Sequence, residues 1–115
     1  YIRRIDSMLN ARGMGEQFEL VGAGISGNKI YDLFLRMQTD VLDAKPDIVF
    51  IFIGVNDVWH KRLAGTGTDA DRFERFYNAI LKKLAAENIK AIICTPAAIG
   101  ERTDFSNEQD GELNN

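Results

Sequence analysis

The sequence Asp47-Ile-Val-Phe-Ile-Phe-Ile-Gly-Val-Asn-Asp57 contains six consecutive apolar residues, 48–53, and ends in an Asn-Asp pair. Most of the six are β-branched or aromatic, so the run predicts a strand buried on both faces, as in parallel sheets. Gly54 permits a sharp turn where this strand ends. Asn56 and Asp57 then lie at its carboxyl end, where open α/β sheets bind ligands. Packing does not require this polar pair, so it is the first candidate for function.

Helix and strand patterns alternate on both sides of this strand. Apolar residues at 3.6-residue spacing predict helices, and short apolar runs bounded by Gly, Asn or Pro predict strands. In chain order we predict a helix that stops at 10–13, a strand over 18–21, a helix over 30–44, the strand over 48–53, a loop over 58–68, a helix over 69–87, a strand over 90–95 and a loop with one helical turn over 97–115. Right-handed crossovers between such strands imply a three-layer α/β fold with a parallel sheet.

Composition and charge exclude several classes of protein. The 115 residues fit a single domain, and 45% hydrophobic with 27% charged residues is typical of globular proteins. A formal net charge of −3 without a basic patch argues against a nucleic-acid partner. The longest apolar run is far shorter than the roughly 20 residues of a membrane span. Cys94 is the only cysteine, and no His and carboxylate cluster is apparent, so we predict no metal site and no cofactor.

A glycine-rich turn, Gly22-x-Gly24-x-x-Gly27, lies between the predicted strand over 18–21 and the helix that follows. The spacing matches the dinucleotide-binding fingerprint, in which a pyrophosphate sits at the helix N-terminus. The context is poor, because Lys29 and Ile30 follow where small residues are expected, and the acidic residue at the end of the next strand, Asp57, lies 30 positions after Gly27 instead of about 20. A dinucleotide-binding module therefore remains an alternative, as does a non-catalytic α/β binding domain.

The glycine turn and the Asn-Asp pair together fit an acyl-transfer site. An ester carbonyl under attack develops negative charge on its oxygen, and each rigid N–H donor aimed at it lowers the barrier by about 3 to 4 kcal/mol. Gly27 offers a backbone N–H with room for a substrate, and the Asn56 carboxamide offers a second donor. Taken singly, each has a plain structural explanation: a tight turn capped by Ser26 or Asn28, and an Asx turn at Asn56 and Asp57.

Three segments resemble the second and third sequence blocks of the SGNH, or GDSL-type, hydrolases: Gly24-Ile-Ser-Gly-Asn28, Lys45-Pro-Asp-Ile-Val49 and Ile53-Gly-Val-Asn-Asp-Val-Trp-His60. The resemblance implies a flavodoxin-like sheet. It also implies a serine esterase or acylhydrolase acting on small carboxylic esters, such as acetyl esters of carbohydrates or lipid esters. Such an enzyme uses a Ser nucleophile, a His base and an Asp that orients the His.

The resemblance also assigns roles to residues. Gly27 and Asn56 correspond to the glycine and asparagine that complete the family's oxyanion hole. Ser26 and Asp57 neighbour this pair and are predicted to line the substrate site. Trp59 and His60 are predicted to line it as well, because the corresponding pair lies near the substrate in relatives that share this segment.

The family's Gly-Asp-Ser block and its Asp-x-x-His block near the carboxyl end are absent, and the only His, His60, falls in the third block and does not match the family's base. We therefore interpret residues 1–115 as the central part of one SGNH-hydrolase-like domain, with the nucleophile and base outside this chain. We expect the chain to be inactive by itself. The missing first strand would leave edges of the sheet unpaired, which predicts assembly into a homo-oligomer or strand exchange between copies.

Overall fold

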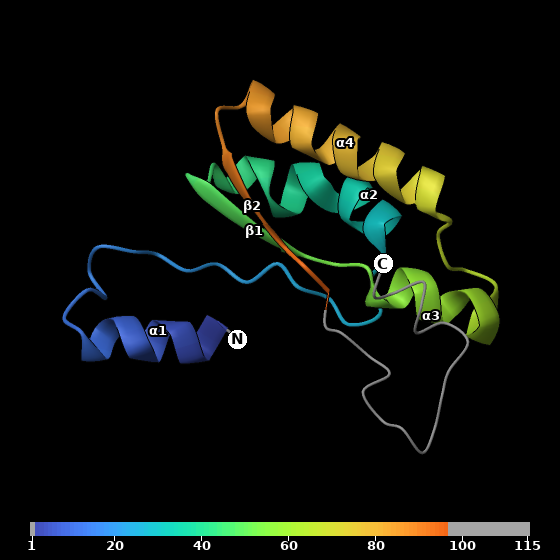
Figure 1. Ribbon diagram of the computed structural model, residues 1–115. Coiled ribbons are helices and arrows are strands. Elements are labelled where there is room, and N and C mark those ends of the chain that lie inside the picture. Colours follow the sequence, from blue (N-terminus) through green and yellow to red (C-terminus); the bar gives the residue numbers. More distant parts are fainter. Residues whose placement is uncertain (1, 97–115) are drawn as a thin grey trace, which may run out of the picture.

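The computed structural model describes residues 2–96, so the prediction for residues 97–115 lies outside the described part. In chain order the elements are α1 (Ile2–Ala11), α2 (Ile30–Asp40), a 3₁₀ turn (Leu42–Ala44), β1 (Ile48–Phe52), α3 (Val55–Ala64), α4 (Ala70–Ala86) and β2 (Lys90–Cys94) (Figure 1). The predicted α/β class with an incomplete parallel sheet is confirmed. No helix within residues 2–96 is long and apolar enough to cross a membrane.

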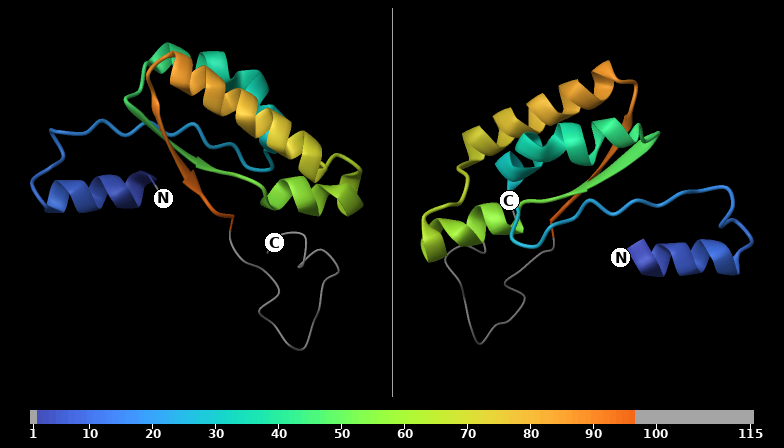
Figure 2. Two further views of the ribbon diagram at one scale, coloured as in Figure 1. Left: turned by 45° about the horizontal axis from the view of Figure 1, so that its top comes forward. Right: turned by 180° about the vertical axis from the view of Figure 1, so that it is seen from behind.

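The sheet pairs β1 with β2 in parallel, with Ile48 opposite Lys90 and Phe52 opposite Cys94. Parallel neighbours need a long crossover, which α3 and α4 provide. Helices α2 and α4 pack side by side on one face of this sheet (Figures 1 and 2). The carboxyl end of β1 therefore leads directly into α3, at the edge of the sheet where ligands bind in open α/β folds.

The core lies between the sheet and the two covering helices. Val49 and Ile51 of β1 point into it, and the buried residues that form it are Ile30, Met37, Ile51, Ile80, Leu84 and Ile89. Each such side chain contributes about 1.5 to 3 kcal/mol on burial. The prediction that the strand over 48–53 is buried on both faces is wrong, because Ile48, Phe50 and Phe52 are 46%, 67% and 46% exposed. Among the described elements, helices cover only one face of β1.

The N-terminal part of the chain differs from its prediction in one element. Helix α1 forms as predicted, but none of its residues is buried. The predicted strand over 18–21 is absent, and residues 18–25 have no regular structure. A strand forms by hydrogen bonding to a neighbouring strand, and the sheet of the described residues contains β1 and β2 alone.

The prediction of a loop over 58–68 is wrong for residues 58–64, because helix α3 begins at Val55 and runs to Ala64, whereas residues 65–68 lie outside any helix or strand. The sequence does carry helix signals there. Asp57 lies in the first turn, Lys61 and Arg62 lie in the last turn, and Gly65 follows with a left-handed φ of 65°. These features match the helix dipole and a glycine C-cap. The helix over 30–44 ends as α2 at Asp40, and the 3₁₀ turn completes it.

Candidate functional site

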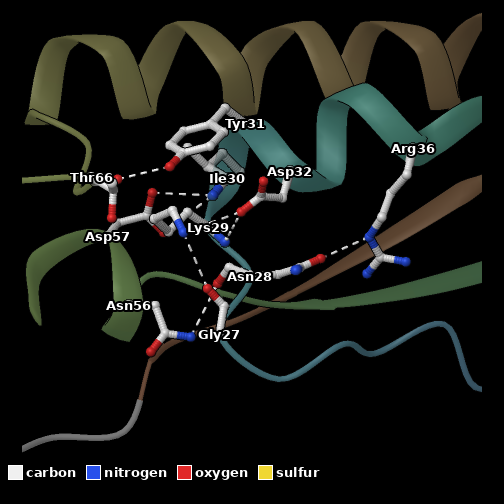
Figure 3. Close-up of polar contacts among 10 residues, drawn as sticks. All are labelled: Gly27, Asn28, Lys29, Ile30, Tyr31, Asp32, Arg36, Asn56, Asp57 and Thr66. Atoms are coloured by element: carbon white, nitrogen blue, oxygen red, sulfur yellow. Dashed lines mark hydrogen bonds and ion pairs between the residues drawn. The ribbon is translucent and has the colours of Figure 1, made fainter. Parts of the chain in front are cut away.

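Two turns meet at the carboxyl end of β1. One is the turn that contains Gly27 and precedes α2, and the other leads from Gly54 into α3. The Asn56 side chain links them, because its Nδ2 donates a hydrogen bond to the Asn28 carbonyl oxygen at 3.1 Å. Figure 3 shows the carboxamide lying beside Gly27. The structure thus brings the two predicted donor residues together, and their role toward a substrate stays a prediction.

Gly27 adopts a conformation that favours glycine. Its φ of +81° lies in the left-handed region. A Cβ built at this position would have no heavy atom within 4 Å, apart from its chain neighbours. Its carbonyl oxygen accepts a hydrogen bond from Lys29 Nζ at 3.3 Å. The backbone conformation therefore favours a glycine here, while the space beside it stays open for another molecule.

Asp57 is buried, with 2% of its surface exposed. Both carboxylate oxygens accept the N–H of Ile30, the first residue of α2, at 3.1 and 3.2 Å. Burial raises the pKa of the Asp57 carboxyl above its usual 3.8, opposed by the Ile30 hydrogen bond and the Lys29 charge. The carboxylate faces α2 (Figure 3). Its predicted role in lining the substrate site stays a prediction, and the structure adds a contact that the sequence did not suggest.

The other three predicted lining residues lie on the same two segments. Ser26 is exposed in the Gly27 turn. Trp59 is 39% exposed, and His60 is half-buried on α3. Trp59 and His60 stand three and four positions after Asn56, so Asn56, Trp59 and His60 share one face of α3. Their proximity to Asn56 follows from α3 being a helix, and contact with a substrate stays a prediction.

Polar side chains of α2 hold the Gly27 turn, and sequence reasoning did not find them. Arg36 donates from Nε to Asn28 Oδ1 at 2.8 Å and from Nη2 to the Ala23 carbonyl at 2.6 Å. Asp32 accepts the Lys29 backbone N–H at 2.9 Å, which caps the helix. An acidic residue at the third helical position is a signal for such a cap. The Arg36 contacts bridge residues far apart in the chain and leave no local pattern.

The alternative dinucleotide site lacks its structural setting. Gly22 and Gly24 line a shallow depression of about 290 Å³ with Arg36 and Asp40, but no strand precedes them. A bound phosphate would also need the free N–H groups at the start of α2. Asp57 already takes the Ile30 N–H. No three His, Cys, Asp or Glu side chains cluster as metal ligands within residues 2–96.

The parallel α/β fold places two polar turns at the carboxyl end of β1, where open α/β sheets bind ligands. A family model described as "GDSL-like Lipase/Acylhydrolase family" matches residues 1–115. The chain therefore belongs to the GDSL-like lipase/acylhydrolase family, and the predicted resemblance is confirmed.

Named relatives give the same result. The chain is 35% identical over 114 residues to an acetylxylan esterase of Geobacillus stearothermophilus, covering 96% of this chain and 50% of that protein. A crystal structure of an acetyl xylan esterase, AlAXEase, matches with a TM-score of 0.92 and 61% identity, covering 99% of this chain and 58% of that one. LAE5, described as an alpha/beta hydrolase enzyme from the metagenome of Lake Arreo, Spain, matches with a TM-score of 0.85 and 28% identity, covering 99% and 53%. The chain spans about half the length of these relatives.

Proposed function

We propose that this chain is the central part of a serine ester hydrolase, in which Gly27 and Asn56 supply oxyanion donors. The observation that carries the proposal is the 3.1 Å hydrogen bond from Asn56 Nδ2 to the Asn28 carbonyl, which holds the carboxamide against the Gly27 turn. A carboxamide has two N–H donors, and this bond uses one of them. The second N–H and the backbone N–H of Gly27 are then the donors for an acyl oxygen.

The chemistry follows the pattern of serine hydrolases. The family uses a Ser nucleophile, which we place outside residues 1–115. Its hydroxyl attacks the ester carbonyl while a His takes the hydroxyl proton. The carbonyl oxygen becomes negatively charged in the tetrahedral intermediate, and the two donors stabilise it by about 3 to 4 kcal/mol each. The alcohol leaves with a proton from the His, and water then hydrolyses the acyl-enzyme. Gly27 and Asn56 act only in the steps that develop the oxyanion.

The substrates that we propose are acetyl esters of carbohydrates. Two of the relatives named above are described as acetylxylan esterases. Trp59, which is 39% exposed on the Asn56 face of α3, offers a flat apolar surface of the kind that packs against a sugar ring. Lipid esters are the second candidate, because the family description includes lipases.

A chimaera tests this proposal, in which residues 1–115 replace the matching half of the Geobacillus stearothermophilus esterase. We expect it to release acetate from p-nitrophenyl acetate and from acetylated xylo-oligosaccharides. Asn56→Ala should lower kcat by about 100-fold to 1000-fold with a nearly unchanged KM, because one oxyanion donor is lost. Asn78→Ala, an exposed asparagine on α4, is the matched control. A folded chimaera without activity, or an Asn56→Ala variant with full kcat, would contradict the proposal.

We also propose that the 115-residue chain by itself does not hydrolyse esters, because the triad residues lie outside it. Turnover of p-nitrophenyl acetate that disappears in Asn56→Ala would show otherwise.

Homo-oligomer formation or strand exchange is proposed for the same chain, since β1 exposes Ile48, Phe50 and Phe52. A monomer in sedimentation velocity would contradict the proposed homo-oligomer or strand exchange.

A further inference from the structure

Adjacent side chains in the first turn of α3 bind the same short segment of backbone. Asn56 donates to the carbonyl of Asn28, and Asp57 accepts from the N–H of Ile30 through both carboxylate oxygens. The segment bound in this way follows Gly27 directly and starts α2 (Figure 3). The start of α3 is therefore fixed to the start of α2 by two side chains with opposite hydrogen-bonding character.

We propose that Asp57 is a positioning residue for this site. It holds the first turn of α3 against α2 and thereby sets the Asn56 carboxamide relative to the Gly27 N–H. This inference rests on the proposed function. Asp57 does not touch the substrate in this account, and it acts through Asn56.

Two carboxylates accept N–H groups at the start of α2, and only Asp57 links this start to another helix. Asp32 takes the Lys29 N–H at 2.9 Å from within the same helix, and Asp57 takes the next N–H, that of Ile30. Asp57 is a second acceptor that comes from another element and is only 2% exposed. Because burial raises its pKa, the ionised carboxylate weakens the fold as the pH rises through that pKa. A buried charge with this cost fits a role in placing the neighbouring residue.

Two further polar contacts hold α3 in other ways. Tyr31 of α2 donates its hydroxyl to the Thr66 carbonyl at 2.8 Å, beyond the far end of α3. The Thr68 N–H donates to the Asp57 carbonyl at 2.9 Å, which ties the segment after α3 back to its first turn. Neither bond joins the first turn of α3 to the start of α2, whereas the Asn56 and Asp57 side chains do. Loss of the Asp57 carboxylate therefore leaves only Asn56, of these two side chains, to make that link.

The chimaera described above tests this role through kcat. A misplacement of about 1 Å at a catalytic group can cost roughly 100-fold in rate. We expect Asp57→Ala to lower kcat by about 10-fold to 100-fold while KM changes little. Asp57→Asn should lose less, because its side-chain oxygen can still accept the Ile30 N–H. Asp71→Ala, which removes an exposed carboxylate from the first turn of α4, is the matched control and should lower kcat far less.

A double-mutant cycle separates positioning from general stability. If Asp57 acts through Asn56, then Asp57→Ala should have almost no further effect on kcat once Asn56 is alanine. An Asp57→Ala loss that persists in full in the Asn56→Ala background would overturn the inference. So would a kcat loss no larger than that of Asp71→Ala. If Asp57→Ala does not fold, Asp57→Asn is compared with Asp71→Asn on the same terms. Failure of the proposed function gives a different result, because Asn56→Ala alone would then keep its activity.

Discussion

Helix α1 and helix α4 have the same kind of amphipathic pattern but different environments. In α1 the apolar residues Ile2, Ile5 and Met8 are 38%, 46% and 51% exposed, and no residue of the helix is buried. In α4 the apolar face packs on the sheet, with Ile80 and Leu84 4% and 1% exposed. An apolar stripe therefore predicts a helix, but it stabilises the fold only where another element covers it.

The largest expected effect compares two isoleucines on these helices. Ile80→Ala removes a side chain from the core and should lower the free energy of unfolding by about 2 to 5 kcal/mol. Ile5→Ala removes an exposed side chain and should change it by less than about 0.5 kcal/mol. Urea unfolding of the 115-residue chain and its two variants measures both values. Equal losses would mean that α1 is packed as firmly as α4.

A second comparison uses two glycines, one in each of the two segments that meet at the candidate site. Gly54, between β1 and α3, is buried with a φ of +129°, so Gly54→Ala should cost about 1 to 3 kcal/mol through backbone strain. Gly24 has a φ outside the left-handed region and no atom within 4 Å of a built Cβ, so Gly24→Ala should cost less than about 0.5 kcal/mol. The same unfolding experiment applies. A larger loss at Gly24 would show that the segment before α2 is more constrained than its contacts indicate.

The smallest expected effect concerns the contacts between residues 22–28 and helix α2. Arg36→Ala removes the bonds to the Ala23 carbonyl and to Asn28 Oδ1, each worth about 0.5 to 1.5 kcal/mol. Amide hydrogen exchange of residues 22–28 should become faster. Arg75→Ala is the control, because within residues 2–96 Arg75 forms an exposed ion pair with Asp71 at 3.9 Å. Unchanged exchange in Arg36→Ala would show that Arg36 does not hold this segment.

The elements that could be predicted from the sequence are those whose pattern is local and whose packing is complete. The strands β1 and β2 and the helix α4 have strong periodicity and pack together, so they appear as expected. Residues 18–21 have a strand-like composition, but a strand also needs a neighbour that local sequence does not reveal. Helix α3 was not predicted, because Gly65 and Gly67 indicate a loop and lie directly after it. The charged residues at the two ends of α3 were the signal for a helix.

The candidate site also has one contact that could be predicted from the sequence and one that could not. The meeting of the Gly27 turn with Asn56 follows from parallel strands that place their carboxyl ends at one edge, a rule that sequence alone can apply. The bond between Asp57 and Ile30 joins residues 27 positions apart. Nothing in the local sequence shows that this carboxylate turns inward while its neighbour does not, because the direction depends on where α2 lies.

The short junction at Gly54 also limits which length changes this region can accept. Strand β1 ends at Phe52 and α3 begins at Val55. In a helix, each added or deleted residue rotates every later side chain by about 100°. One residue inserted at the start of α3 would therefore place Asn56 where Asp57 now points, and would turn the Asp57 carboxylate away from Ile30 by about 100°. Changes of chain length in this region should leave the Gly54 junction intact, together with the Thr66 and Thr68 backbone that bonds to Tyr31 and Asp57.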